Sequence, residues 1–289
     1  MATGRFKQFK VDFYVVTIDG ERQHNWLTGL LADERGFTDA ISLNPGDDEK
    51  FQIRSIVSIK NGEAYKAVFG RCRFGETPEQ GAVDGSEDDV KLKPGYGLVE
   101  KNHFLFYPSQ NMIVYQRNQS GSHYSKFQRY VARVINITNV AFEPILTGDS
   151  YKKLLDPQVK AKKVDLSFLP PKDPSLYPKE WTKDAIKLIN RLGGVSARIT
   201  IGVGRAKRQG LLAEAKDVAV MLARAGLAKV AKVKIDDQPE PIDLIADRVV
   251  ETAKARVGDN GRLIPEMVYS ALDNARHKRR KDINHFFGT

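Results

Sequence analysis

Residues 195–235, VSARITIGVGRAKRQGLLAEAKDVAVMLARAGLAKVAKVKI, determine the expected fold of the second half of the chain. From residue 195 to residue 203, apolar and polar side chains alternate with the period of a half-buried strand. Between residues 211 and 225 the apolar side chains recur at helical spacing, and Gly226 is suited to cap the end of that helix. Val233 and Ile235 then indicate another strand, so the stretch predicts a strand, a helix and a second strand.

The turn between the first strand and the helix is basic, since it carries Arg205, Lys207 and Arg208. Free N–H groups and the positive end of the helix dipole favour phosphate at such a place. The turn lacks the Gly-Lys-Ser/Thr ending of a nucleotide loop, and its glycine spacing differs from the dinucleotide fingerprint. A phosphate-binding turn and a solvated basic turn therefore both stay open.

The charge of the chain is unevenly distributed along its 289 residues, and the total is +10. Residues 1–150 contain 18 Lys and Arg against 19 Asp and Glu, whereas residues 151–289 contain 28 against 17. The second half therefore carries an excess of +11. This excess predicts a polyanion partner, with nucleic acid as the leading hypothesis and an anionic membrane surface as the alternative.

Cys72 is the only cysteine, which excludes an intrachain disulfide framework and a cysteine-based zinc cluster. The N-terminal residues lack an apolar segment followed by a small-residue cleavage site, and no apolar run approaches the ~20 residues of a membrane span. We therefore expect a cytoplasmic protein.

The first half of the chain has the pattern of a sheet built from hairpins. Asn61-Gly62 lies between two strand-like segments, 51–60 and 64–74, and favours a two-residue hairpin turn. The apolar runs FLFY (104–107) and MIVY (112–115) predict a second hairpin, and residues 123–136 predict a helix.

An acidic segment, residues 75–93, carries six carboxylates and few large apolar side chains, so we expect a mobile loop there. It could shield the basic face of the protein or be a simple solvated loop. Prolines cluster at residues 169–178, where no regular element can run. We accordingly expect an α+β protein with two domains: residues 1–165, with a mixed or antiparallel sheet, and residues 166–289, a smaller basic α/β domain.

An enzyme is not indicated, and we expect no catalytic residue, no metal site and no cofactor. The five histidines are scattered, and neither a nucleophile elbow nor a phosphate loop is present. Asp236-Asp237 and the acidic run 87–89 could bind a metal ion, but both lie in turn-like sequence. A metal-dependent nuclease therefore stays an alternative, since it would need convergent carboxylates on ordered elements.

Basic residues are the candidate site, because scattered Lys and Arg bind phosphates without reading base sequence. Lys232 and Lys234 alternate with core positions and are expected on one outward face of a strand. The run 276–281 is too uniformly basic for a recognition helix, and a helix end stabilised by its dipole is the alternative for it. The predicted nucleic-acid-binding residues are Arg198, Arg205, Lys207, Arg208, Lys229, Lys232, Lys234, Arg276, Lys278, Arg279, Arg280 and Lys281.

Several short sequence motifs occur in an order that resembles their order in the RexA phage-exclusion proteins. They are HFLFYPSQNMIVYQRN (103–118), FEPIL (142–146), IDLIADRVVETAKARV (242–257) and DNGRL (259–263), with FYVV and LTGLLAD nearer the N-terminus. The resemblance implies a homodimer that binds double-stranded DNA with little sequence preference and acts as a sensor for a separate membrane channel partner in antiviral defence by abortive infection. A DNA binder of the Kiwa defence system is similar in broad terms. Neither resemblance provides a residue motif that can be transferred.

The expected function is therefore sequence-independent binding of double-stranded DNA. Two alternatives come from other classes: the metal-dependent nuclease, and a basic protein-interaction subunit that does not bind DNA.

Overall fold

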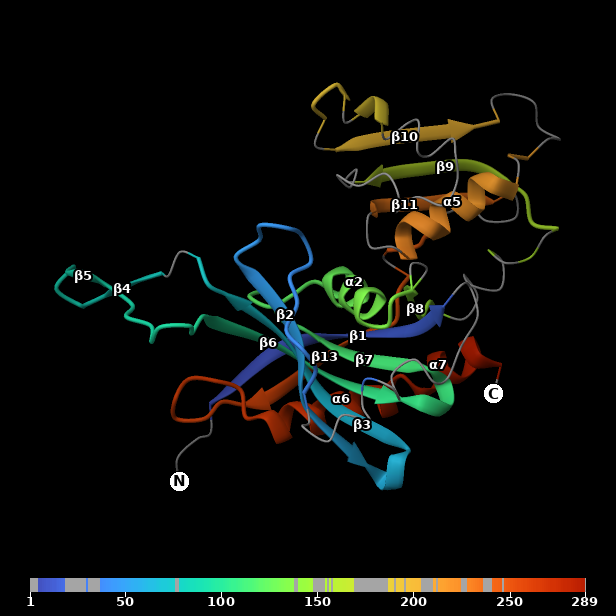
Figure 1. The fold of residues 1–289 in the computed structure, drawn as a ribbon. Helices are drawn as coiled ribbons and strands as arrows, with labels where there is room; N and C mark the ends of the chain where they lie inside the picture. The colour runs from blue at the N-terminus through green and yellow to red at the C-terminus, as the bar shows by residue number, and fades with distance from the viewer. Residues whose placement is uncertain are drawn as a thin grey trace. The chain divides into compact units, whose positions relative to one another are not determined.

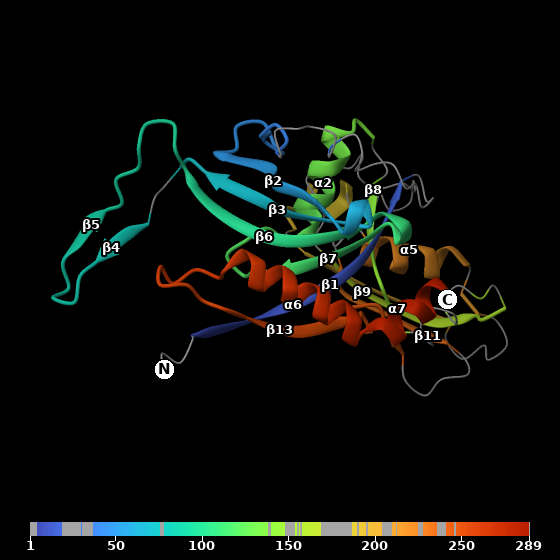
Figure 2. The same ribbon diagram turned by 90° about the horizontal axis from the view of Figure 1, so that it is seen from below.

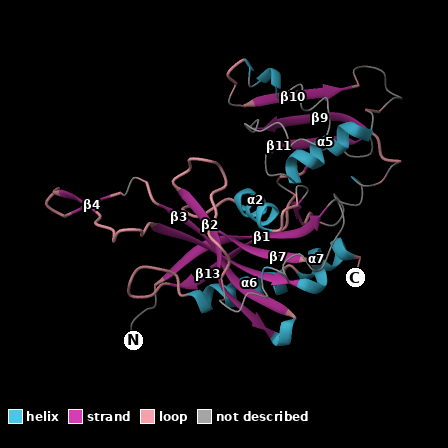
Figure 3. Cartoon of the chain, in the orientation of Figure 1, coloured by secondary structure: helices cyan, strands magenta, loops and turns pink. Residues whose placement is uncertain are grey.

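The structure is a computed structural model that describes residues 5–18, 30, 37–75, 78–137, 140–147, 154, 156, 158–168, 187–189, 191–194, 196–203, 210–211, 213–224, 228–235, 241–245 and 247–288. The described chain is α+β, with antiparallel sheets and more strand than helix (Figure 3). It divides into a first unit, Met1–Phe142 with Val250–Arg279, and a second unit, Glu143–Val249 with Arg280–Thr289. No helix in the described ranges is both long and apolar enough to cross a membrane.

The first unit is built on a seven-stranded sheet, in which β13, β1, β7, β6, β3 and β2 are neighbours in that order and β8 also pairs with β1 (Figure 1). All five pairings along this path are antiparallel. The strands are β1 (Phe6–Ile18), β2 (Glu49–Ile59), β3 (Ala64–Arg73), β6 (Leu98–Tyr107), β7 (Met112–Arg117), β8 (Val140–Pro144) and β13 (Val250–Arg256).

Both expected hairpins of the first unit are confirmed, but the expected two-residue turn at Asn61-Gly62 is wrong, because residues 60–63 connect the paired residues Ile59 and Ala64. β2 and β3 are joined through the short 3-10 turn η1 (Lys60–Gly62), where Asn61 and Gly62 take positive φ values of 55° and 91°. β6 and β7 are joined through η2 (Pro108–Gln110) and Asn111, which has φ 50°. Asparagine and glycine accept this left-handed conformation most readily, so local turn chemistry sets the register of both hairpins.

Two helices cover this sheet on opposite faces (Figure 2). The expected helix at 123–136 is observed as α2 (Tyr124–Val134), and its fully buried Phe127 packs on Phe69, Phe104 and Tyr115 of the sheet. On the other face, α6 (Pro265–Lys278) contacts β6, β7 and β13. Alternate side chains of the central strands are therefore buried on both faces, as the continuous apolar runs predict.

The last part of the first unit comes from late in the sequence. β13 pairs with β1 over seven residues, from Phe6 opposite Arg256 to Asp12 opposite Val250. The expected division placed residues 166–289 together, whereas residues 250–279 belong with the first sheet. Because strand pairing between residues so distant in sequence leaves no local signal, spacing alone could not assign β13 to this sheet.

The second unit has a four-stranded sheet in the order β10, β9, β11, β12 and a helix, α5 (Ala213–Arg224). Its strands are β9 (Ala161–Phe168), β10 (Ala197–Gly202), β11 (Ala228–Ile235) and β12 (Ile242–Asp243), and the unit also includes α7 (Arg280–Phe287). The predicted strand, helix and strand are confirmed as β10, α5 and β11. However, β9 lies between the two strands and pairs antiparallel with both, so a boundary at residue 165 would cut a central strand.

Within residues 75–93, where a mobile loop was expected, the structure has a short hairpin. β4 (Glu79–Gly81) and β5 (Glu87–Asp89) form a two-stranded ribbon that extends away from the large sheet of the first unit (Figures 1 and 2). We call residues 78–90 the acidic arm. The proline cluster at 169–178 lies outside the described residues.

Candidate nucleic-acid interface

The centre of the candidate interface is β9, a strand whose side chains alternate between two faces of the second sheet. Val164, Leu166 and Phe168 are buried and belong to the core that includes Val218 and Leu222 of α5. The intervening positions of β9, from Lys163 to Ser167, therefore lie on the face opposite α5. None of these β9 residues was among the predicted site residues.

Strand register brings the predicted basic residues onto this same face. One row across the sheet contains Arg198 of β10 opposite Ser167. The next row has Thr200, Asp165 and Lys232, and the third has Gly202, Lys163 and Lys234. We call the resulting surface the outer face, and its polar side chains are Lys163, Asp165, Ser167, Arg198, Thr200, Lys232, Lys234 and Asp243.

Asp165 holds Arg198 in position on the outer face. The Arg198 guanidinium donates to both carboxylate oxygens of Asp165, from Nη2 at 2.8 Å and from Nε at 3.1 Å, and Thr200 Oγ1 donates at 3.2 Å. The hydrogen bonds from Arg198 have the largest effect in lowering the pKa of Asp165. The hydrogen bond from Thr200 and the charge of Lys163 lower this pKa further. The Arg198 side chain is 68% exposed, so this ion pair orients the guanidinium and adds little to stability.

Lys163 and Lys234 form a like-charge pair directly across the ladder between β9 and β11. Both side chains are exposed, and Lys234 makes no ion pair with any residue that the structure describes. Lys232, one row away, pairs with Asp243 of β12 at 3.3 Å. Like charges at directly opposed positions destabilise a sheet, so an anion bound between the two ammonium groups would be favoured.

Between Arg198 and Lys232 the sequence predicts four further site residues, of which the structure describes only Lys229. Lys229 is exposed on β11, at the irregularity in pairing between Ala228 and Val230. Arg205, Lys207 and Arg208, which form the basic turn, lie outside the described residues.

The predicted basic cluster at residues 276–281 is not a uniform run of free cations. The Arg276 guanidinium lies over the ring of Tyr107, with 4.1 Å between Cζ and the ring centroid, and Arg279 Nε donates to Glu251 Oε2 at 3.0 Å. Lys278, Arg280 and Lys281 are exposed. Arg276 and Arg279 are therefore held by the first unit itself.

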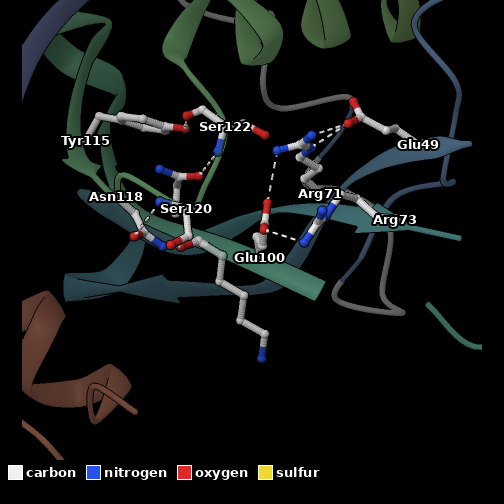
Figure 4. A network of polar contacts seen from close by, with 10 residues as sticks. Glu49, Arg71, Arg73, Glu100, Tyr115, Asn118, Ser120 and Ser122 are labelled. Atoms are coloured by element: carbon white, nitrogen blue, oxygen red, sulfur yellow. Dashed lines mark hydrogen bonds and ion pairs between the residues drawn. The ribbon is translucent and has the colours of Figure 1, made fainter. Parts of the chain in front are cut away.

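Cations of the first unit near the start of α2 are also neutralised by neighbours (Figure 4). Arg71 pairs with Glu49 and with Glu100, the latter at 3.0 Å, and Arg73 pairs with Glu100 at 3.1 Å. The hydrogen bond from Arg71 to Glu49 raises the pKa of the guanidinium. In the same view, Ser120 N donates to Asn118 Oδ1 at 3.3 Å, and Tyr115 Oη donates to the Ser122 carbonyl at 2.9 Å. The charges of Arg71 and Arg73 are balanced by those of Glu49 and Glu100.

The second unit has a larger positive charge than the first unit. The difference between the two units is smaller than the difference between the two halves of the sequence. The first unit contains 24 Lys and Arg against 21 Asp and Glu, a balance of +3, and the second contains 22 against 15, a balance of +7. The difference arises because residues 250–279, with their basic helix end, belong to the first unit.

Metal chemistry has no visible basis in the described part of the chain. No three or more His, Cys, Asp or Glu side chains there are grouped so that they could hold a metal ion. Asp236-Asp237 lies outside the described residues, and the acidic run at 87–89 is the exposed strand β5. The arrangement on the outer face is one that can bind anions.

Comparison with known proteins identifies the family of the chain. No curated protein matches the sequence. A family model described as a family of unknown function (DUF6731) matches residues 5–283, which is nearly the whole chain. The chain therefore belongs to this family of unknown function, DUF6731.

Proposed function

We propose that this protein binds double-stranded DNA without sequence preference, through the outer face of the second unit. The observation that carries the proposal is the pair of exposed lysines, Lys163 and Lys234, at directly opposed positions with Arg198 and Lys232 on the same face. Lysine and arginine at phosphates supply affinity that does not depend on base sequence.

The geometry of a strand suits this role. Lys232 and Lys234 lie two residues apart on β11, which separates their side chains by roughly 7 Å. Lys163 extends the row sideways by one strand spacing, about 4.8 Å. Neighbouring cations can therefore each contact a different phosphate oxygen, while a flat sheet face without a protruding helix cannot enter the major groove to read bases.

Two carboxylates limit the affinity of this face. Asp165 and Asp243 lie among four cations, so the net charge of the charged outer-face side chains is +2. We expect binding that is moderate at physiological salt and falls steeply as salt rises. The resemblance to RexA phage-exclusion proteins supports the same proposal and adds its setting: a cytoplasmic DNA sensor in an abortive-infection system, working with a separate membrane channel partner.

Fluorescence anisotropy with two duplexes of equal length and unrelated sequence tests the proposal. The expected result is equal affinity for both duplexes and a linear fall of log K with log salt concentration, with a slope of about 0.9 for each phosphate contacted. Absence of binding at low salt would overturn the proposal and leave an acidic protein as the better partner. Cleavage of the duplex on addition of Mg²⁺ or Mn²⁺ would instead identify a nuclease.

A further inference from the structure

The acidic arm lacks any core of its own. Its side chains from residue 78 to residue 89 are all exposed, and within the described part of the chain its two strands pair only with each other, over three residues each. An isolated two-stranded ribbon is marginally stable at best in water. Contact with a second surface would therefore stabilise a ribbon this short.

The charge of the arm identifies the kind of surface it fits. Between residues 78 and 90 the arm carries five carboxylates and no lysine or arginine. Glu79 lies directly opposite Asp89 across the ribbon, which is a like-charge pair that destabilises it. At the tip, the Asp84 carboxylate accepts hydrogen bonds from Ser86 N at 3.0 Å and Ser86 Oγ at 2.7 Å. These bonds within the turn stabilise its conformation without a contact from another segment. The strands, in contrast, have no counter-charge among the residues that the structure describes.

The outer face has the complementary arrangement. Its opposed lysines, Lys163 and Lys234, are separated by one strand spacing, and so are the opposed carboxylates Glu79 and Asp89. Cβ atoms of directly opposed residues are about 5 Å apart in either ladder, so the two pairs match in spacing and differ in sign. A narrow ribbon laid on a flat sheet would bring these four charges into two ion pairs.

We propose that the outer face of one copy of this chain is the docking site for the acidic arm of a second copy. A two-fold exchange would satisfy both arms and both faces and would close the assembly as a dimer. The inference builds on the proposed function by adding its regulation: the arm and the DNA use the same lysines, so DNA must displace the arm in order to bind.

Reciprocal charge reversal tests this docking with the full chain and no DNA present. The arm variant carries Glu79→Lys with Asp89→Lys, and the face variant carries Lys163→Glu with Lys234→Glu. A matched control, Glu63→Lys with Asp259→Lys, reverses two exposed carboxylates of the first unit that lie outside the arm. Thermal melting of each variant establishes that it is folded, and sedimentation velocity at low and high salt gives its mass.

We expect the parent chain and the control to be dimers at low salt that dissociate at high salt. Each reversed variant alone would be monomeric, with dimerisation weakened by roughly 100-fold, because like charges are forced together. An equimolar mixture of the arm variant and the face variant would form a dimer again, because the reversed arm then meets the reversed face and the native arm meets the native face.

A monomeric parent chain at low salt would overturn the docking proposal, and so would dimers of either variant alone or a mixture that stays monomeric. The assay contains no nucleic acid, so its outcome is separate from the proposed function. If a monomeric parent chain still binds duplex DNA, only the docking fails. If the mixture dimerises and the parent chain never binds DNA, only the DNA proposal fails.

Discussion

Lys163 of β9 and Lys234 of β11 lie directly opposite each other in an antiparallel ladder, and both side chains are exposed. A protein selected for stability alone would gain by replacing one of them, since opposed like charges weaken a sheet. The pair has a physical rationale if an anion occupies the space above it, and the nearby Arg198 and Lys232 extend the same surface.

Asp165 should lower the affinity of the outer face for anions. Asp165→Asn removes one negative charge from the middle of the outer face and keeps an oxygen that can accept from Arg198. We expect duplex affinity at low salt to rise by roughly fivefold, the effect of about 1 kcal/mol between charges near 4 Å apart in water. Anisotropy measures the change, and Asp259→Asn, at an exposed turn of the first unit, provides the control. An unchanged or lower affinity for Asp165→Asn would place the DNA elsewhere.

Arg276 should contribute to stability and not to DNA binding, although the sequence marked it as a site residue. Arg276→Ala removes the guanidinium that lies over Tyr107, and we expect a loss of about 1 kcal/mol in the free energy of unfolding with no change in the salt dependence of binding. Urea denaturation and anisotropy measure the two effects. Its exposed neighbour Lys278, changed to Ala, should leave stability unaltered. If Arg276→Ala reduces the slope of log K against log salt, Arg276 contacts the DNA and the prediction is wrong.

Phe127 should be among the most costly positions to truncate. Its ring is fully buried and lies 4.6 Å from the ring of Phe69 and 4.9 Å from that of Phe104, measured between centroids. Phe127→Ala should lower the free energy of unfolding by about 3–5 kcal/mol, because lost burial and a new cavity add together. Tyr96→Ala, at an exposed aromatic residue of the same unit, should cost less than about 0.5 kcal/mol. Similar losses for the two variants would contradict the packing described for α2.

His103 should make the first unit sensitive to acid. The ring is 6% exposed and hydrogen-bonded through Nδ1 to Gln116 Oε1 at 2.8 Å. Burial, with a smaller contribution from the charge of Lys101, lowers its pKa below the ordinary value near 6.5. Below about pH 6.5 the unfolded chain therefore binds a proton that the folded chain does not, and stability falls as pH falls.

His103→Asn should remove this part of the pH dependence, so its free energy of unfolding should change less than that of the parent between pH 7 and pH 5. Urea denaturation at a series of pH values measures it, with His285→Asn at an exposed position as the control. Identical pH profiles for the parent chain and His103→Asn would show that the pKa of His103 is the same in the folded and unfolded states.

Local pattern was enough to predict much of this fold. Asn61-Gly62 defined one hairpin, and the apolar spacing of α2 and α5 defined two helices, because turn chemistry and helical period are set by neighbouring residues. The sheet partner of β13 could not be predicted, since pairing between distant segments depends on how the whole chain packs.

The candidate site was predicted in part. Arg198, Lys232 and Lys234 were identified from charge and alternation, and they share one face. Lys163 was missed because no strand was predicted at residues 161–168. The signal was available in the alternation of Val164, Leu166 and Phe168, which marks β9 as a strand with one buried face.

The most direct test of the central claim is the salt dependence of duplex binding by Lys163→Ala with Lys234→Ala, compared with a control that removes two exposed cations of the first unit, Lys7→Ala with Arg262→Ala. The account predicts that the outer-face variant loses roughly 2 from the slope of log K against log salt and binds unrelated duplexes equally weakly, whereas the control keeps the parental slope. An outer-face variant that melts like the parent and retains the parental slope would contradict the claim that this face binds DNA.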